Sequence, residues 1–126
     1  MSLNILVVDD SAVMRKMIIK TLNMSGIPLG NIMEASDGKE GLQKLEENWI
    51  DLLMIDINMP VMDGMEMLNH VRSNPRTKDT PVLIVSTESN EQRIANFYKL
   101  GASFVHKPFT PEELRQEISR MTDIPA

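Results

Sequence analysis

The chain has 126 residues, a length that predicts one domain whose hydrophobic core is large enough to fold without disulfides. Hydrophobic residues make up 42% of it, and no apolar run approaches the roughly 20 residues that span a bilayer, so we expect no membrane insertion. The net charge of −5, with scattered Lys and Arg, disfavours direct nucleic-acid binding. Cysteine is absent and no signal peptide is recognisable, so we expect a cytoplasmic location.

Short apolar runs alternate with segments of helical spacing along the chain. Residues 5–8, 52–55 and 82–85 are strand-length apolar runs, 103–105 is a shorter one and 32–35 a weaker one. Each run is followed by a segment with apolar residues three or four positions apart, which predicts five helices. These spacings are Met14, Ile18 and Leu22; Leu42 and Leu45; Met65, Leu68 and Val71; Ile94, Phe97 and Tyr98; and Leu114, Ile118 and Met121.

Helix punctuation agrees with this pattern. Gly26 and Pro28 follow the first helical segment, Asp37 and Asn90 are suited to cap the second and fourth, and Thr110-Pro111 opens the last. Strands that are apolar on both faces and alternate with helices predict a parallel sheet covered on both sides. We therefore expect one doubly wound α/β domain over residues 1–126, with no linker or internal repeat.

Polar residues follow the apolar strands at the point where each strand ends. Asp9 and Asp10 follow the first run, Asp56 the third, Ser86 the fourth and Lys107 the fifth. The carboxyl ends of parallel strands share one edge of a sheet, which is where ligands bind in this fold class. We therefore expect these five side chains to meet.

Their chemistry suits phosphoryl transfer. Clustered carboxylates repel one another, and a hard divalent cation such as Mg²⁺ relieves that repulsion. A lysine and a hydroxyl aimed at the same point suit the oxygens of a phosphoryl group, and an aspartate can be the nucleophile. Asp56, central between the acidic pair and the Ser86 and Lys107 side, is the best candidate.

Each residue alone has a simpler interpretation. Asp9 and Asp10 could cap the first helix, Ser86 could be an ordinary turn residue, and Lys107 an exposed strand end. Asp63-Gly64 is most simply a turn. The joint placement at four strand ends argues against these alternatives.

The ordered motifs resemble the CheY-like receiver domains of two-component response regulators over essentially the whole chain. The resemblance is carried by Val7-Val8-Asp9-Asp10-Ser11, Asp56-Ile57-Asn58-Met59-Pro60-Val61-Met62-Asp63-Gly64, Val85-Ser86-Thr87-Glu88, Gly101-Ala102 and Lys107-Pro108-Phe109.

The resemblance implies a flavodoxin-like sheet of five parallel strands in the order 2-1-3-4-5 with five helices. It also implies that Asp10, Asp56 and the Asn58 carbonyl bind Mg²⁺ directly, with Asp9 acting through water. Ser86 and Lys107 would hold the phosphoryl oxygens, and the Lys107-Pro108 bond would be cis.

The same resemblance implies a switch. Phosphorylation of Asp56 by a sensor histidine kinase would draw Ser86 and then Phe104 inward, altering the face of the fourth helix, fifth strand and fifth helix, where an unknown target binds. Phe104 lacks the hydroxyl of the tyrosine found in chemotaxis regulators. Asn58 and Glu88 would tune the phosphate lifetime, which we expect to be short.

Two rival functions remain open at this point. An Asp-nucleophile phosphatase would need a general acid two residues after Asp56, where Asn58 stands, and a substrate pocket. A phosphorylation-independent adaptor would keep only the fold, which the intact acidic pair, Asp56, Ser86 and Lys107 disfavour. We therefore expect no enzyme that acts on external substrates.

Overall fold

Strands and helices alternate along the whole chain in the computed structural model, which describes residues 2–57, 59 and 61–122. Over these residues the strands are β1 (Leu3–Val8), β2 (Leu29–Ala35), β3 (Leu52–Asp56), β4 (Val82–Ser86) and β5 (Ser103–His106). The helices are α1 (Ala12–Met24), α2 (Gly38–Glu47), α3 (Gly64–Ser73), α4 (Glu91–Lys99) and α5 (Pro111–Met121).

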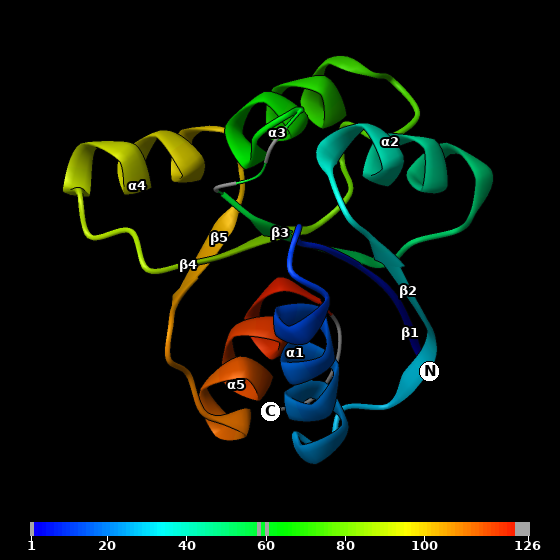
Figure 1. The fold of residues 1–126 in the computed structure, drawn as a ribbon, viewed down its shortest axis with the longest axis vertical. Coiled ribbons are helices and arrows are strands. Elements are labelled where there is room, and N and C mark those ends of the chain that lie inside the picture. Colours follow the sequence, from blue (N-terminus) through cyan, green and yellow to red (C-terminus); the bar gives the residue numbers. More distant parts are fainter. Residues whose placement is uncertain (1, 58, 60, 123–126) are drawn as a thin grey trace.

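The strands form one parallel sheet in the order β2-β1-β3-β4-β5, as expected (Figure 1). Every residue of β4 is buried, which explains why this strand is a continuous apolar run rather than an alternating one. Chain order reverses between β1 and β3, because β2 pairs on one side of β1 and β3 on the other. The carboxyl edge at this reversal is the expected ligand crevice of a doubly wound sheet.

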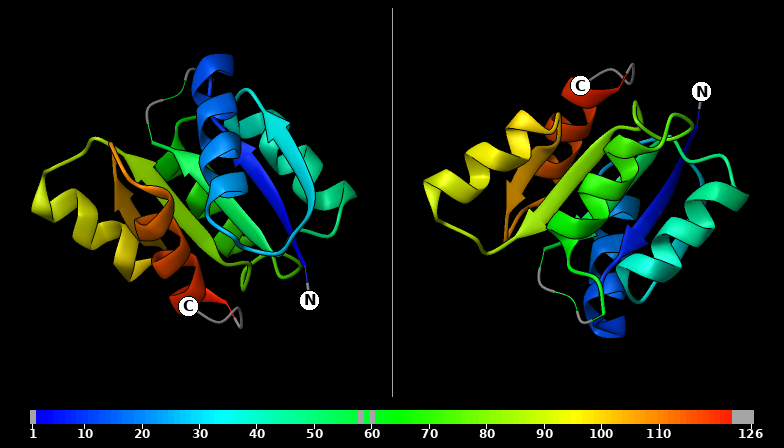
Figure 2. Two further views of the ribbon diagram at one scale, coloured as in Figure 1. Left: turned by 90° about the horizontal axis from the view of Figure 1, so that it is seen from below. Right: turned by 90° about the horizontal axis from the view of Figure 1, so that it is seen from above.

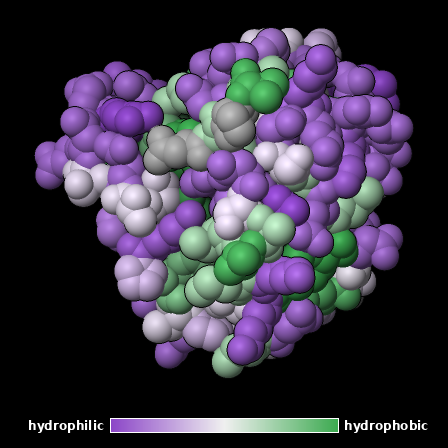
Figure 3. Space-filling view, in the orientation of Figure 1, coloured by the Kyte–Doolittle hydropathy of each residue, from purple (hydrophilic) through white to green (hydrophobic). Residues whose placement is uncertain are grey.

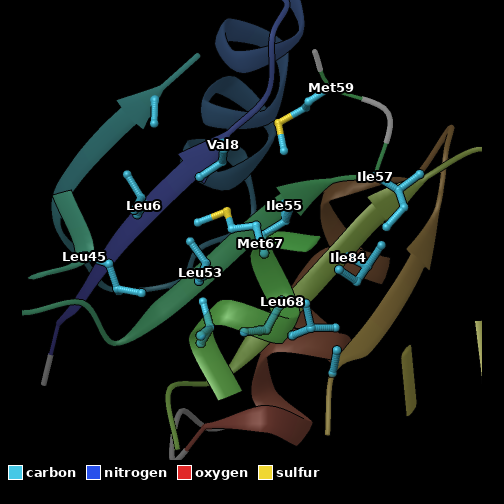
Figure 4. Packing of buried hydrophobic residues seen from close by; sticks show 14 of the residues in the cluster. Leu6, Val8, Leu45, Leu53, Ile55, Ile57, Met59, Met67, Leu68 and Ile84 are labelled. Atoms are coloured by element: carbon cyan, nitrogen blue, oxygen red, sulfur yellow. The ribbon is translucent and has the colours of Figure 1, made fainter. Parts of the chain in front are cut away.

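Helices cover both faces of the sheet, with α2, α3 and α4 on one side and α1 and α5 on the other (Figures 1 and 2). The first face buries a cluster that includes Leu6, Leu53, Met67 and Leu68 (Figure 4). The cluster on the opposite face contains the strand residues that point to that face, such as Ile5, together with apolar residues of α1 and α5. The sheet therefore separates two cores.

Local signals set most helix starts. Asp37, Asn90 and Thr110 cap α2, α4 and α5, each accepting a hydrogen bond from the backbone amide three residues later, as the sequence predicts. Asp63, interpreted from sequence as a simple turn residue, also caps α3 by accepting from the Glu66 amide at 2.8 Å. Gly26 adopts the left-handed φ of 81° just after α1.

Helix α4 contacts the rest of the chain through little apolar surface. Of its residues, all of which the structure describes, Phe97 alone is fully buried. Tyr98, which belongs to the spacing that predicted this helix, is 53% exposed. Neighbouring positions on a helix point about 100° apart, and here Phe97 is buried while Tyr98 lies toward solvent.

The surface seen in Figure 3 is mostly hydrophilic, with scattered apolar areas. The large apolar side chains that are exposed are Val13, Met17, Met24, Trp49, Val61 and Tyr98. Within the residues that the structure describes, none of the helices has the length and apolar character needed to cross a membrane.

Candidate functional site

Four neighbouring strands bring the predicted site residues to one edge of the sheet. Asp9 and Asp10 follow β1, Asp56 ends β3, Ser86 ends β4 and Lys107 follows β5. Since these strands are adjacent in the sheet order, residues nearly one hundred positions apart in sequence come together. The structure therefore confirms the expected convergence, whereas the individual roles of these residues stay predictions.

Asp9, Asp10 and Asp56 form the acidic centre of the site. Each offers one carboxylate oxygen, and these oxygens lie within 4.8 Å of one another. Asp10 is exposed, Asp56 is partly buried and Asp9 is only 2% exposed. Desolvation raises the pKa of Asp9 above its usual value, and the charges of Asp56 and Asp10 act in the same direction. A hydrogen bond from the Ser11 amide and the charge of Lys107 oppose this rise in pKa.

Lys107 reaches into the acidic centre from the end of β5. Its Nζ lies 3.7 Å from Asp56 Oδ1 and 3.8 Å from Asp9 Oδ2, which is ion-pair distance but longer than a direct hydrogen bond. Its backbone amide donates to the Ser86 carbonyl at 2.8 Å, joining the ends of β4 and β5. The Lys107-Pro108 peptide bond is cis, as expected.

The acidic centre fits a hard divalent cation. Asp9 Oδ2 is buried and has no hydrogen-bond partner among the residues that the structure describes. An orphaned carboxylate oxygen beside two further carboxylates offers the oxygen ligands that Mg²⁺ prefers. Asp9, Asp10 and Asp56 could therefore hold such an ion, whereas the predicted ligand Asn58 lies outside the described residues.

Ser86 and Glu88 share a turn at the end of β4. The Ser86 side chain is buried, and its Oγ accepts a hydrogen bond from the Glu88 amide at 3.0 Å. The Glu88 carboxylate is held within its own loop and helix, since Oε1 accepts from the Asn90 amide at 3.2 Å and Oε2 lies 3.3 Å from Arg93 Nη1. The Ser86 hydroxyl is therefore held in one orientation by the Glu88 amide.

Phe104 lies on the α4 side of the sheet, partly buried against the core. Its ring stacks on Phe97 with centroids 6.2 Å apart and an interplanar angle of 16°, and His106 meets it edge-on. Phe104 therefore connects β5 directly to the one buried side chain of α4. The structure does not bring Phe104 into contact with Ser86 through any hydrogen bond or ring contact among the described residues.

The simpler interpretation of Asp9 and Asp10 as helix caps is wrong. Ser11 caps α1, and its Oγ accepts from the Met14 amide at 3.1 Å. Asp9 Oδ1 accepts from the Ser11 amide at 2.9 Å, and Oδ2 stays at the sheet edge together with the exposed Asp10.

Asp63-Gly64 has a packing role beside the site. A Cβ on Gly64 would lie 2.6 Å from the Asp56 carbonyl oxygen, so only glycine lets the start of α3 approach the end of β3 this closely.

Arg15 is a site residue that sequence reasoning missed. Its Nη1 donates to the Asp9 carbonyl at 2.7 Å, and its Nε donates to Glu34 Oε1 at 2.9 Å. Its place one turn after the acidic pair was the available signal. The partner Glu34 could not be inferred without the order of the strands.

Comparisons with known proteins agree with this geometry. The model of the response regulator receiver domain matches residues 5–119. The chemotaxis protein CheY1 of Helicobacter pylori is 36% identical over 118 residues, which cover 92% of this chain and 94% of that protein. The CheY homolog of Campylobacter jejuni is 35% identical, covering 92% of this chain and 89% of that protein.

Solved structures give the same result. The chemotaxis response regulator CheY4 of Vibrio cholerae superposes with a TM-score of 0.84 at 34% identity, covering 97% of this chain and 100% of that one. The Francisella response regulator 1452 receiver domain has a TM-score of 0.82 at 29% identity, covering 95% and 96% of the two chains. Motifs, fold, acidic centre and relatives agree, and the chain belongs to the response regulator receiver domain family.

Proposed function

We propose that this chain is a phospho-acceptor signalling switch in which Asp56 receives a phosphoryl group from a sensor histidine kinase. The observation that carries the proposal is the meeting of Asp9, Asp10 and Asp56 with Lys107, whose Nζ lies 3.7 Å from Asp56 Oδ1. Receiver domains typically bind Mg²⁺, and the carboxylates of this chain suit that ion.

In the proposed reaction a carboxylate oxygen of Asp56 attacks the phosphorus atom, and the bond to the donor nitrogen of the kinase histidine breaks. The donor imidazole leaves with the electron pair of that bond, and Asp56 becomes an acyl phosphate. Mg²⁺ bound among the carboxylates would neutralise the charge on the transferring oxygens. Lys107, whose Nζ lies beside Asp56, would meet the same charge, and Ser86 would donate its hydroxyl proton to a phosphoryl oxygen.

The proposed output is a change of the face formed by α4, β5 and α5. If Ser86 turns toward the phosphoryl group, the hydrogen bond from the Glu88 amide must lengthen or break, which releases the β4–α4 connection. Phe104 would then repack against Phe97, and a downstream protein would select the altered face. A chemotaxis-type pathway is favoured by the names of the relatives, and the cysteine-free sequence agrees with a cytoplasmic location.

A switch of this kind does not turn over external substrates. The chain would catalyse only its own phosphorylation and dephosphorylation. Asn58 also stands where an Asp-nucleophile phosphatase would need its general acid.

The decisive experiment is intact-mass analysis after incubation with acetyl phosphate and Mg²⁺. Wild type is expected to gain one phosphoryl group, whereas Asp56→Asn and a chelated wild-type sample are expected to gain none. If wild type gains no mass even after rapid quenching, the phosphorylation-independent adaptor becomes the better function.

Glu88 gives a prediction about the lifetime of the phosphate. Replacing it with leucine puts a bulky apolar group in place of a carboxylate that is 16% exposed in the loop after Ser86, and is expected to hinder the attacking water and slow dephosphorylation several-fold. The decay of the phosphorylated mass after removal of acetyl phosphate measures this rate. An unchanged decay rate would remove Glu88 from the set of lifetime-tuning residues.

A further inference from the structure

Arg15 is a cation that the fold partly encloses beside the acidic centre. Its side chain is 16% exposed, whereas its neighbour Lys16 on α1 is exposed. Arginine is rarely buried without partners, and here the guanidinium bridges two segments. It donates one hydrogen bond of 2.7 Å to the Asp9 carbonyl after β1 and another of 2.9 Å to the Glu34 carboxylate on β2.

This bridge completes the restraint of Asp9. The Asp9 amide donates to the Ala35 carbonyl at 3.1 Å, and Asp9 Oδ1 accepts from the Ser11 amide at 2.9 Å. With the carbonyl held by Arg15, three polar groups of Asp9 have fixed partners. Oδ2 is left to face the acidic centre, 3.8 Å from Lys107 Nζ.

Glu34 is itself held where it can orient the guanidinium. Lys44 of α2 donates to the Glu34 carbonyl, so the backbone that carries this carboxylate is tied to α2 as well as to β1. Glu34 is 44% exposed, and ion pairs of such exposure contribute little to the free energy of unfolding. The geometry of the pair thus points to orientation of Asp9 rather than to overall stability.

We propose that Arg15 is a positioning residue for the metal site, acting through Asp9, whose peptide carbonyl it holds so that the carboxylate keeps the orientation that suits a bound cation. The inference rests on the proposed function, because it concerns the same Mg²⁺ site. Outer residues that orient metal ligands typically change affinity by about 10- to 100-fold when replaced.

Geometry and charge make opposite predictions for this residue. The guanidinium contacts the backbone of Asp9, and its positive charge repels a bound cation. Loss of the charge alone would therefore tighten Mg²⁺ binding. Loss of its hydrogen bonds would loosen Asp9 and weaken Mg²⁺ binding. The direction of the change in affinity therefore separates the two roles.

The test is calorimetric titration of Mg²⁺ into wild type, Arg15→Gln, Arg15→Lys and the control Lys16→Gln. Arg15→Gln is expected to weaken binding about tenfold. Arg15→Lys keeps the charge but cannot bridge Asp9 and Glu34 with one planar group, and is also expected to weaken binding. Lys16→Gln removes an equal charge from the same helix without touching Asp9, and is expected not to weaken binding.

A second measurement needs no metal. The Ser11 amide donates to Asp9 Oδ1, so its hydrogen exchange in chelator reports the hold on Asp9. Exchange at Ser11 is expected to be faster in both Arg15 variants, while amides of β3 and β4 keep wild-type rates.

Unchanged or tighter Mg²⁺ binding in Arg15→Gln, with Arg15→Lys equal to wild type, would overturn the inference and leave the proposed function standing. Wild-type exchange at Ser11 in both variants would also overturn it. Failure of wild type itself to bind Mg²⁺ would instead overturn the proposed metal site, and the inference with it.

Discussion

Asp9 lies in the folded chain as a buried carboxylate, 2% exposed, with Asp10 and Asp56 in the same cluster. Burial first, and the like charges of its neighbours after it, raise its pKa above the usual 3.8. The folded state therefore binds this proton more tightly than the unfolded state does. Stability falls as the pH rises from 3.8 through the raised pKa, and the full penalty applies above that pKa.

Asp9→Asn is accordingly expected to raise the free energy of unfolding at neutral pH in chelator. The gain should shrink as the pH falls toward 3.8, where both states protonate Asp9 in the parent chain. Urea denaturation across this pH range measures the effect. Added Mg²⁺ should stabilise wild type and not the variant, and a gain that ignores pH would contradict the electrostatic cause.

Val61 adopts a left-handed backbone conformation, with a φ of 68°, while its side chain is 78% exposed. This conformation is strained for a β-branched residue and costs about 1–3 kcal/mol. Val61→Asn is expected to raise the free energy of unfolding by about 1 kcal/mol, because asparagine tolerates this region. Thermal and urea unfolding measure the change.

The control for Val61 is Val13→Asn, which replaces a valine that is 70% exposed within α1. Helix propensities of valine and asparagine are similar, so this substitution is expected to leave stability nearly unchanged. Equal effects at both positions would mean that the gain at Val61 came from polarity and not from relief of backbone strain.

Individual site residues were predictable to different degrees. Asp9 follows β1, and Asp56 and Ser86 are the last residues of β3 and β4. The edge that they share followed from the apolar runs and the parallel sheet. CheY is itself an example of the rule that ligands bind at this edge, so the agreement is not independent of the family. Arg15 and Glu34 were not predictable, because their contact depends on which strand lies beside β1.

At the scale of elements, each predicted strand and helix is present, and the differences lie at the ends. β2 begins at Leu29, three residues before the predicted start, because Leu29 pairs with Leu3 of β1. The register shifts over Gly30 and Asn31, which are poor strand formers. For α4 the sequence predicted the position of the helix but not its burial. Its spacing predicted a helix correctly, but not that only one side chain would be fully buried.

The single buried anchor of α4 gives a prediction about this element. Phe97→Leu keeps apolar bulk but loses the stacking on Phe104, and is expected to lower the free energy of unfolding by about 1 kcal/mol. Amide exchange should rise in α4 and β5 more than in β1 and β3.

Tyr98→Leu is the matched control, because it removes a ring from the same helix at a position that is 53% exposed. It is expected to leave α4 exchange unchanged. A uniform rise in exchange throughout the sheet after Phe97→Leu would show that the anchor stabilises the whole fold and not α4 in particular.

For the whole molecule, the alternation of strands and helices predicted the class of fold, and the family resemblance supplied the strand order. Sequence pattern alone could not assign each helix to a face of the sheet, since that follows from the order of the strands and the right-handed connections between them. With α2, α3 and α4 on one face and α1 and α5 on the other, two apolar clusters form with the sheet between them.

This partition is testable with conservative core substitutions. Ile84→Val lies in one cluster and Ile118→Val in the other, and each is expected to cost about 0.5–1.5 kcal/mol. Their sum should match the double variant within about 0.5 kcal/mol. Ile55 and Ile84 are paired across β3 and β4 in the same cluster, so Ile55→Val with Ile84→Val should depart from additivity. Chemical denaturation of the three single and two double variants measures these free energies.

Additive energies on the two sides of the sheet would give this small domain a freedom that its length alone does not suggest. Substitutions in the cluster beneath α2, α3 and α4 could accumulate without compensating changes in the cluster beneath α1 and α5. The sheet would then let the two clusters change independently during evolution, while the acidic centre at its edge stays common to both.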